Sequence, residues 1–182
     1  MDVSVKKAAS SRLYGAVDIG GTKIAVGIVS SFGEVVWSSE FPTEASLGPE
    51  RALGQICAVM DDGIIGVGRR LEATGVGCTG PVDPVSGTIG DVALLPGWQG
   101  YPLCSQLEKH FKAPACLEND CDAAALGGFS YGAGRGSARF LYTTISTGIG
   151  VGIVVDGKVY RGTAGAHPEL GHHTIDHSAG PD

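Results

Sequence analysis

The sequence has no cluster of basic residues and no hydrophobic run long enough to span a membrane. Its 182 residues include 13 Lys and Arg against 19 Asp and Glu, a formal net charge of −6 at pH 7. This balance disfavours a surface for nucleic acid or an anionic membrane. The opening "MDVSVKKAASSRL" also lacks the apolar core of a signal peptide. We therefore expect a cytoplasmic globular protein that binds small ligands, with no nucleic-acid and no membrane partner.

The cysteines lack the spacing of a disulfide framework or a metal site. They are odd in number, contain no C-x-x-C pair and have mostly apolar neighbours. We interpret them as reduced core residues of a cytosolic protein. They are Cys57, Cys78, Cys104, Cys116 and Cys121. With 43% hydrophobic residues, the chain can bury one full core, or one core and part of a second.

The pattern of apolar residues predicts an α/β protein. Strands are predicted at four runs rich in Val and Ile, residues 14–17, 23–29, 35–41 and 73–78. Between the third and fourth, apolar residues from Ala52 to Leu71 recur at helical spacing. The Gly- and Pro-rich stretch 79–103 predicts turns and short hairpins. A helix at 102–110, a strand at 115–118 and a helix that begins with "NDCDAAALGG" follow.

A second β-rich block at 140–160 repeats the opening of the chain. "STGIGVGIVVDGKVY" resembles "IGGTKIAVGIVSSFGEVV", with Gly152 in the place of Gly27, 125 residues earlier. Each copy is a Gly-rich turn, a strand, a tight turn and another strand. We infer two related lobes: a flexible tail at 1–12, an α/β lobe at 13–118 and the start of a second lobe at 119–182.

The Gly-rich turn in "DIGGTK" is a candidate phosphate site. Glycine permits positive φ and lets backbone N–H groups approach an anion closely. For one such turn alone, a plain hairpin is the slightly favoured explanation, but a second matching turn in the repeat could hold a triphosphate from the other side. Asp18 would face the accompanying Mg²⁺, directly or through water. The candidate nucleotide residues are Asp18, Gly20, Gly21, Thr22, Lys23, Thr147, Gly148 and Gly150.

Two common nucleotide motifs are excluded. The Walker A spacing G-x-x-x-x-G-K-[ST] is absent. Gly75, Gly77 and Gly80 satisfy G-x-G-x-x-G after a predicted strand, but the "PVDP" that follows cannot open the helix that a dinucleotide site requires.

Polar residues at two further places are candidate site residues. Asn119 and Asp120 follow a predicted strand, where functional side chains of α/β sheets gather. Either could instead cap the next helix. Glu169 and His172 lie in "HPELGHH", for which a generic His-rich turn is the alternative.

Four motifs in order resemble the ROK family, which includes sugar kinases and repressors. They are "DIGGTK", "GPVDP…LPGW", "ENDCDAAALG" and "STGIGVGIVVDGKVYRGTAGAHPELGH", within residues 14–182. The resemblance implies an actin-like ATPase (ribonuclease-H-like) α/β fold, with a complete first lobe and the beginning of a second.

The resemblance also implies a glucokinase-like, ATP-dependent transfer of phosphate to a hexose hydroxyl. Asp120 matches the catalytic base, and the Gly-rich turns match the two phosphate loops. The positions that match sugar contacts are Gly80, Asn119, Asp120, Glu169 and His172. His172 also matches a ligand of a structural Zn²⁺. The implied cofactors are ATP and Mg²⁺, with Zn²⁺ in the full-length protein, which is expected to be a homo-oligomer.

The sequence also departs from the family pattern. Leu94 stands where an Asn commonly contacts the sugar, and the chain stops before the family's Cys-rich zinc turn and adenosine pocket. We therefore expect a fragment that is inactive by itself. The alternatives are a sugar-responsive ROK regulator and a non-catalytic sugar-binding protein. The regulator is less favoured, since only 13 residues precede Tyr14.

Overall fold

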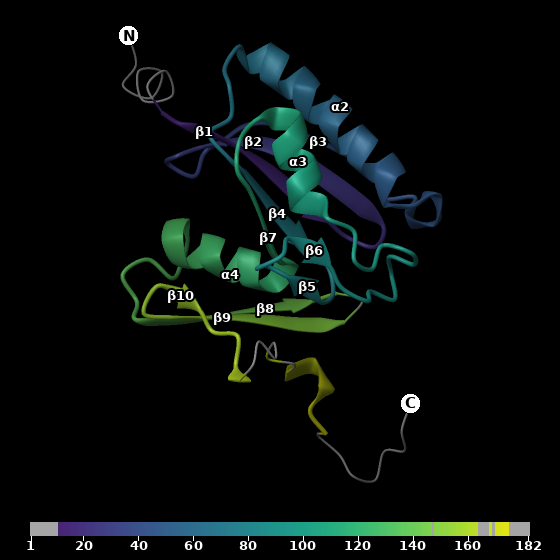
Figure 1. The fold of residues 1–182 in the computed structure, drawn as a ribbon. Helices are drawn as coiled ribbons and strands as arrows, with labels where there is room; N and C mark the ends of the chain where they lie inside the picture. Colours follow the sequence, from purple (N-terminus) through teal and green to yellow (C-terminus); the bar gives the residue numbers. More distant parts are fainter. Residues whose placement is uncertain (1–10, 147, 164–167, 169, 175–182) are drawn as a thin grey trace. The chain divides into compact units, whose positions relative to one another are not determined.

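A computed structural model describes residues 11–146, 148–163, 168 and 170–174 (Figure 1). The chain divides into two compact units, Met1–Asp120 and Cys121–Asp182. Most of the predicted tail lies outside the described residues. Its last two residues belong to the fold, since the Ser11 carbonyl accepts a hydrogen bond from Arg69 and the Arg12 carbonyl accepts one of 2.9 Å from the Ser31 N–H.

The first unit is built on a five-stranded mixed sheet with the strand order β3-β2-β1-β4-β7. Strands β1, β2 and β3 are antiparallel neighbours, whereas β1, β4 and β7 run parallel. These strands, at the predicted places, are β1 (Leu13–Ile19), β2 (Lys23–Ser30), β3 (Val35–Pro42), β4 (Thr74–Cys78) and β7 (Ala115–Asn119). The other elements are η1 (Ala45–Leu47), α2 (Pro49–Val67), the hairpin β5 (Val82–Asp83) and β6 (Thr88–Ile89), and α3 (Leu103–Phe111).

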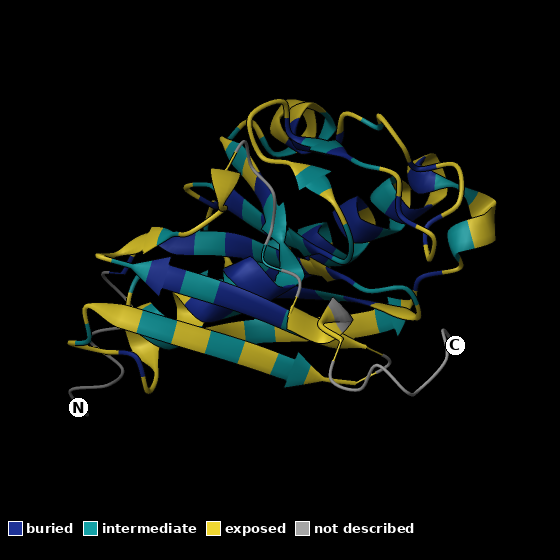
Figure 2. Ribbon diagram, turned by 90° about the horizontal axis from the view of Figure 1, so that it is seen from below, coloured by how far each residue is buried: buried dark blue, intermediate teal, exposed yellow. Residues whose placement is uncertain are grey.

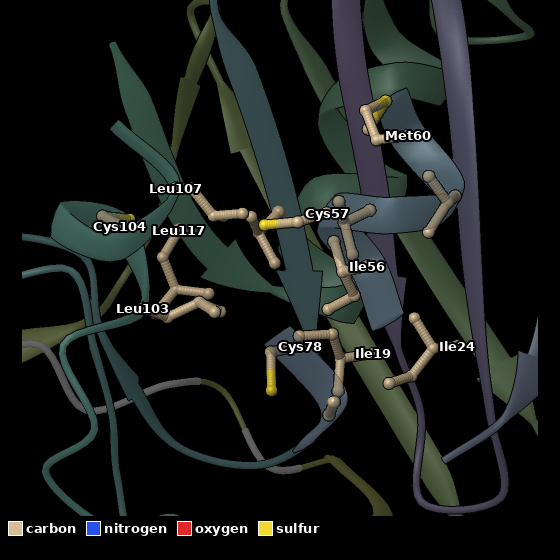
Figure 3. Packing of buried hydrophobic residues seen from close by; sticks show 14 of the residues in the cluster. Ile19, Ile24, Ile56, Cys57, Met60, Cys78, Leu103, Cys104, Leu107 and Leu117 are labelled. Carbon is tan, nitrogen blue, oxygen red and sulfur yellow. The ribbon is translucent and has the colours of Figure 1, made fainter. Parts of the chain in front are cut away.

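The core of this unit lies between one face of the sheet and the helices α2 and α3. Alternate residues of β1, β2 and β4 are buried, whereas β3 has no buried residue. Figure 3 shows Ile19, Ile24 and Ile56 in the buried cluster. Each fully buried aliphatic side chain contributes roughly 1.5–3 kcal/mol. No disulfide joins the cysteines, all of which are described. Four are buried as predicted, but Cys116 is exposed, so the prediction of a core residue was wrong there.

Helix α2 begins and ends at residues suited to those positions. Pro49 lies in the first turn, where its missing N–H costs nothing. Gly68 has φ 69° and donates its N–H to the Ile64 carbonyl, which ends the helix. The prediction that the helical stripe reaches Leu71 was therefore wrong. Leu71 is nonetheless buried, because it packs into the core from the segment after the helix.

The second unit has a three-stranded antiparallel sheet with the order β10-β9-β8. Its elements are α4 (Asp120–Tyr131), whose first residue still belongs to the first unit, β8 (Arg139–Ile145), β9 (Ile149–Val155), β10 (Lys158–Val159) and η3 (Leu170–His172). Exposed residues alternate with less exposed ones along β8, a pattern also visible on the strands of Figure 2. The hairpins β1–β2 and β8–β9 occupy corresponding places in the predicted repeat.

Among the described residues, no helix has the length and apolarity needed to cross a membrane.

Candidate active site

Three candidate residues meet where the parallel strands end. The register places Ile19 beside Cys78, and Cys78 beside Asn119, across β1, β4 and β7. Asp18 comes one residue before this row and Asp120 one residue after it. The carboxyl ends of parallel strands are the edge at which α/β sheets place functional side chains. The fold thus brings Asp18, Asn119 and Asp120 to one edge of the first unit.

Burial and nearby charges raise the pKa of Asp18 and of Cys78 at this edge. Burial raises the pKa of Asp18, the negative charge of Asp120 raises it further, and the positive charge of Lys23 acts in the opposite direction. The same two carboxylates and, above all, burial raise the pKa of the Cys78 thiol to about 12. Cys78 therefore stays protonated at neutral pH, and a cation near the two carboxylates would relieve their repulsion.

The "DIGGTK" turn joins β1 to β2 at the same edge. Within it, the Gly20 N–H donates to the Lys23 carbonyl at 3.0 Å. Thr43, which follows β3, adds two bonds: its N–H donates to the Thr22 carbonyl at 3.0 Å and its hydroxyl donates to the Gly20 carbonyl at 2.6 Å. Sequence reasoning missed Thr43. Its one signal was a hydroxyl residue two positions after the predicted strand 35–41, which is next in the chain to the strand that follows the turn.

The glycines of this turn are required by the space around them. Neither Gly20 nor Gly21 has a φ in the left-handed region, so the turn does not use the positive φ that glycine permits at these two positions. Space is the constraint instead. A Cβ on Gly21 would lie 2.9 Å from Cβ and Cδ1 of Leu94, and one on Gly20 would lie 3.1 Å from the Lys23 carbonyl oxygen.

Lys23 is engaged at the surface. Its Nζ lies 2.8 Å from Oε2 of Glu40, and both side chains are more than half exposed. The hydrogen bond to Glu40 is the main cause that raises the pKa of Lys23. Because exposed ion pairs are weak, Glu40 would compete little with a phosphate for this ammonium group.

The loop after β4 is held to this edge by its glycine and by buried side chains. Gly80 has φ 75°, and its carbonyl accepts a hydrogen bond of 3.1 Å from Nδ2 of Asn119. A Cβ on Gly80 would lie 2.8 Å from Val92, which is buried like Trp98 further along the loop. Trp98 Nε1 donates to the Ala45 carbonyl at 3.1 Å. These anchors leave Leu94 exposed beside Gly21.

In the second unit, the two candidate glycines have different surroundings. A Cβ on Gly148 would have nothing within 4 Å, whereas one on Gly150 would collide with Sγ of Cys121 on α4. Packing against α4 therefore requires glycine at position 150, whereas Gly148 has free space where a Cβ would be. Thr147 and Glu169 lie outside the described residues. His172 ends η3, but its side chain is not described.

The described residues do not supply a zinc site. Among them, no three His, Cys, Asp or Glu side chains gather as a metal site would require. The expected role of His172 as a zinc ligand therefore stays a prediction. Asp18 offers the carboxylate oxygen that Mg²⁺ prefers, with Asp120 near enough to affect its pKa.

A cavity of about 720 Å³ lies elsewhere, between α2 and α3. Its lining includes Cys57 and Tyr101, and also His110, whose Nε2 lies 2.8 Å from Asp61 Oδ2. None of the predicted site residues lines this cavity. We therefore place the candidate site at the edge of the sheet, where the carboxylates and the Gly-rich turn meet.

Comparison with known proteins gives consistent matches. The model of the ROK family matches residues 14–181. A glucokinase of Halalkalibacterium halodurans is 34% identical over 169 residues, which are 91% of this chain and 51% of that protein. A xylose repressor of Caldicellulosiruptor bescii is 35% identical over 116 residues, 63% of this chain and 27% of that protein. The chain spans about half the length of the curated kinases it matches.

Solved structures of the same family have this fold. A ROK hexokinase from Thermus thermophilus matches with a TM-score of 0.78 and 38% identity, over 90% of this chain and 53% of that one. A ROK family glucokinase from Streptomyces griseus, in complex with glucose and AMPPNP, matches with a TM-score of 0.78 and 34% identity, over 92% and 51%. These matches confirm the predicted actin-like ATPase fold.

Proposed function

We propose that this chain, which belongs to the ROK family, is part of an ATP-dependent sugar kinase. Such an enzyme transfers the γ-phosphoryl group of ATP to a hexose hydroxyl. The observation that carries the proposal is the edge at which Asp120, Asn119 and the Gly20–Thr22 turn meet. A glucokinase among its relatives and a glucose-bound structure among its neighbours support a hexose as the acceptor. Because those proteins are about twice as long, the activity is proposed for the whole protein.

We assign Asp120 the role of catalytic base. An ordinary carboxylate is too weak a base to deprotonate an alcohol in advance. The loose transition state of phosphoryl transfer requires only that the proton leaves late, as the new P–O bond forms. Asp120 would first orient the acceptor hydroxyl and then accept its proton, which is typically worth roughly 10²- to 10⁴-fold in rate.

The other candidate residues would position the two substrates. Asn119 and Gly80 join β7 to the loop after β4, and with Glu169 and His172 they are proposed to hold the sugar. The turn from Gly20 to Lys23 would bind the nucleotide phosphates through backbone N–H groups, with Thr147, Gly148 and Gly150 as the second loop. Asp18 would bind the Mg²⁺ that accompanies ATP and neutralises charge on its phosphates. No step of this proposal uses zinc.

A coupled assay of ADP release by the whole protein tests the proposal. The acceptors are glucose, mannose, N-acetylmannosamine, allose and fructose. We expect ADP release that requires ATP, Mg²⁺ and one preferred sugar. Absence of turnover with every sugar would contradict the kinase assignment.

The similarity to a xylose repressor supports a second candidate, a sugar-responsive regulator. Sugar binding without ADP release, measured by calorimetry, would favour either this regulator or a non-catalytic sugar-binding protein. Sugar-dependent binding of the whole protein to DNA would then distinguish these two.

A further inference from the structure

Thr43 is the residue outside the "DIGGTK" turn that fixes the turn's backbone. It follows Pro42 at the end of β3 and is 3% exposed. Its hydroxyl donates to the Gly20 carbonyl at 2.6 Å, and its own N–H donates to the Thr22 carbonyl at 3.0 Å. Two carbonyls of the turn are therefore held by a single buried residue of the neighbouring strand end.

The bond from the hydroxyl sets the direction of a backbone donor. The peptide bond between Gly20 and Gly21 is planar and trans, so its carbonyl and its N–H point in opposite directions. When Thr43 holds the Gly20 carbonyl, the Gly21 N–H must point away from Thr43. Without the hydroxyl, this peptide plane could rotate, because glycine on both sides imposes little steric restriction.

We propose that Thr43 is a positioning residue for nucleotide binding: its hydroxyl holds the Gly20–Gly21 peptide so that the Gly21 N–H can donate to a phosphate. The part that concerns phosphate rests on the proposed kinase function. The part that concerns the turn does not, because it follows from the two hydrogen bonds alone. Neither Thr43 nor its hydroxyl needs to touch the nucleotide.

The chain offers a matched control for removal of the hydroxyl. Thr74 on β4 is also buried, at 1% exposed, and its hydroxyl is among the buried side-chain atoms of the described residues that have no hydrogen-bond partner. Thr74→Val makes the same chemical change in the same unit without removing a hydrogen bond. Thr43→Ser keeps the hydroxyl and removes only a methyl group, so it should retain the wild-type behaviour.

The first experiment measures the turn itself. Hydrogen exchange followed by mass spectrometry on the whole protein should show faster deuterium uptake in peptides that cover Gly20–Lys23 for Thr43→Val. Uptake there should be unchanged for Thr43→Ser and Thr74→Val. Thr43→Ala serves as a second variant if Thr43→Val does not fold. Unchanged uptake in a folded variant that lacks the hydroxyl would overturn the inference, whatever the protein's activity.

The second experiment measures the ligands by calorimetry. Thr43→Val should weaken binding of MgATP by roughly 3- to 10-fold, the effect of one lost hydrogen bond, and leave sugar affinity unchanged. KM for ATP should rise more than kcat falls. If Thr43→Val shows faster hydrogen exchange but binds MgATP as tightly as Thr74→Val does, the role of Thr43 in phosphate binding is overturned. If the wild type itself does not bind MgATP, the kinase proposal fails, and the exchange result alone decides whether Thr43 fixes the turn.

Discussion

The side-chain amide of Asn119 donates a hydrogen bond of 3.1 Å to the carbonyl oxygen of Gly80. This bond joins the end of β7 to the loop that follows β4, so two residues predicted to contact the same substrate also contact each other. The loop then continues through buried Val92 and Trp98. The hydrogen bond therefore fixes the orientation of the Asn119 side chain and the start of the loop at Gly80.

Asn119→Asp tests this connection. A carboxylate cannot donate to the Gly80 carbonyl and repels it, so the loop should detach from the end of β7. We expect sugar affinity to fall by about tenfold or more, in line with a lost and unfavourably replaced hydrogen bond. Calorimetry with sugar and with MgATP measures the effect, and Gln99→Ala is the control for a change on an exposed loop position. Sugar affinity equal to that of the control would remove Asn119 from the proposed site.

Gly21 and Leu94 should be energetically coupled. Since a Cβ on Gly21 would lie 2.9 Å from Leu94, Gly21→Ala should displace Leu94 and lower the melting temperature. Leu94→Gly removes all of the obstructing atoms, Cβ included, so the double variant should recover part of the loss. A double-mutant cycle on thermal stability and MgATP affinity measures the coupling. An equal penalty for Gly21→Ala with and without Leu94 would show that crowding is not the reason for glycine.

Asp18→Asn should change the dependence of stability on pH. The pKa of Asp18 is raised above its ordinary value of 3.8, mainly by burial, so the folded chain binds this proton more tightly than the unfolded chain. Ionised Asp18 therefore destabilises the fold at neutral pH, and the cost disappears once both states are protonated.

Denaturant titrations should thus show Asp18→Asn to be more stable than the wild type at pH 7, with the difference vanishing as the pH falls below 3.8. Asp62→Asn, on the exposed side of α2, controls for the loss of a negative charge. A stability difference between Asp18→Asn and the wild type that stays constant from pH 7 to below 3.8 would contradict burial of the Asp18 carboxylate as its cause.

Gly148 and Gly150 should respond differently to alanine. Gly150→Ala would drive a Cβ into Cys121 on α4 and should cost about 1–3 kcal/mol of unfolding free energy, typical of overpacking. Gly148→Ala meets no atom within 4 Å and should leave stability unchanged. If Gly148 belongs to a phosphate loop, its variant should nevertheless weaken MgATP binding. Thermal melts and calorimetry on both variants separate packing from ligand contact.

The local elements could be predicted from the sequence because their signals are local. The alternation of apolar residues gave β1 to β4, and the helical spacing from Ala52 gave α2. The end of α2 was misjudged, since Leu71 continues the apolar spacing although Gly68 has already ended the helix. Apolar spacing reports burial, and a residue after a helix can be buried as well.

Contacts between distant segments could not be predicted. The approach of Leu94 to Gly21 and the bonds from Thr43 depend on strand order and on a loop path that spacing does not encode. For the same reason, the crowding that requires glycine at positions 20 and 21 could not be recognised in the sequence. Asp18, Asn119 and Asp120 were identifiable because each lies at the end of a predicted strand.

Asp120→Asn in the whole protein tests the central claim most directly. The substitution keeps the shape of the side chain and removes the proton acceptor, so kcat for sugar phosphorylation should fall by about a hundredfold or more while sugar affinity changes much less. Asp62→Asn makes the same chemical change away from the edge and should retain the wild-type rate. A kcat of Asp120→Asn close to that of this control would contradict the assignment of Asp120 as the base.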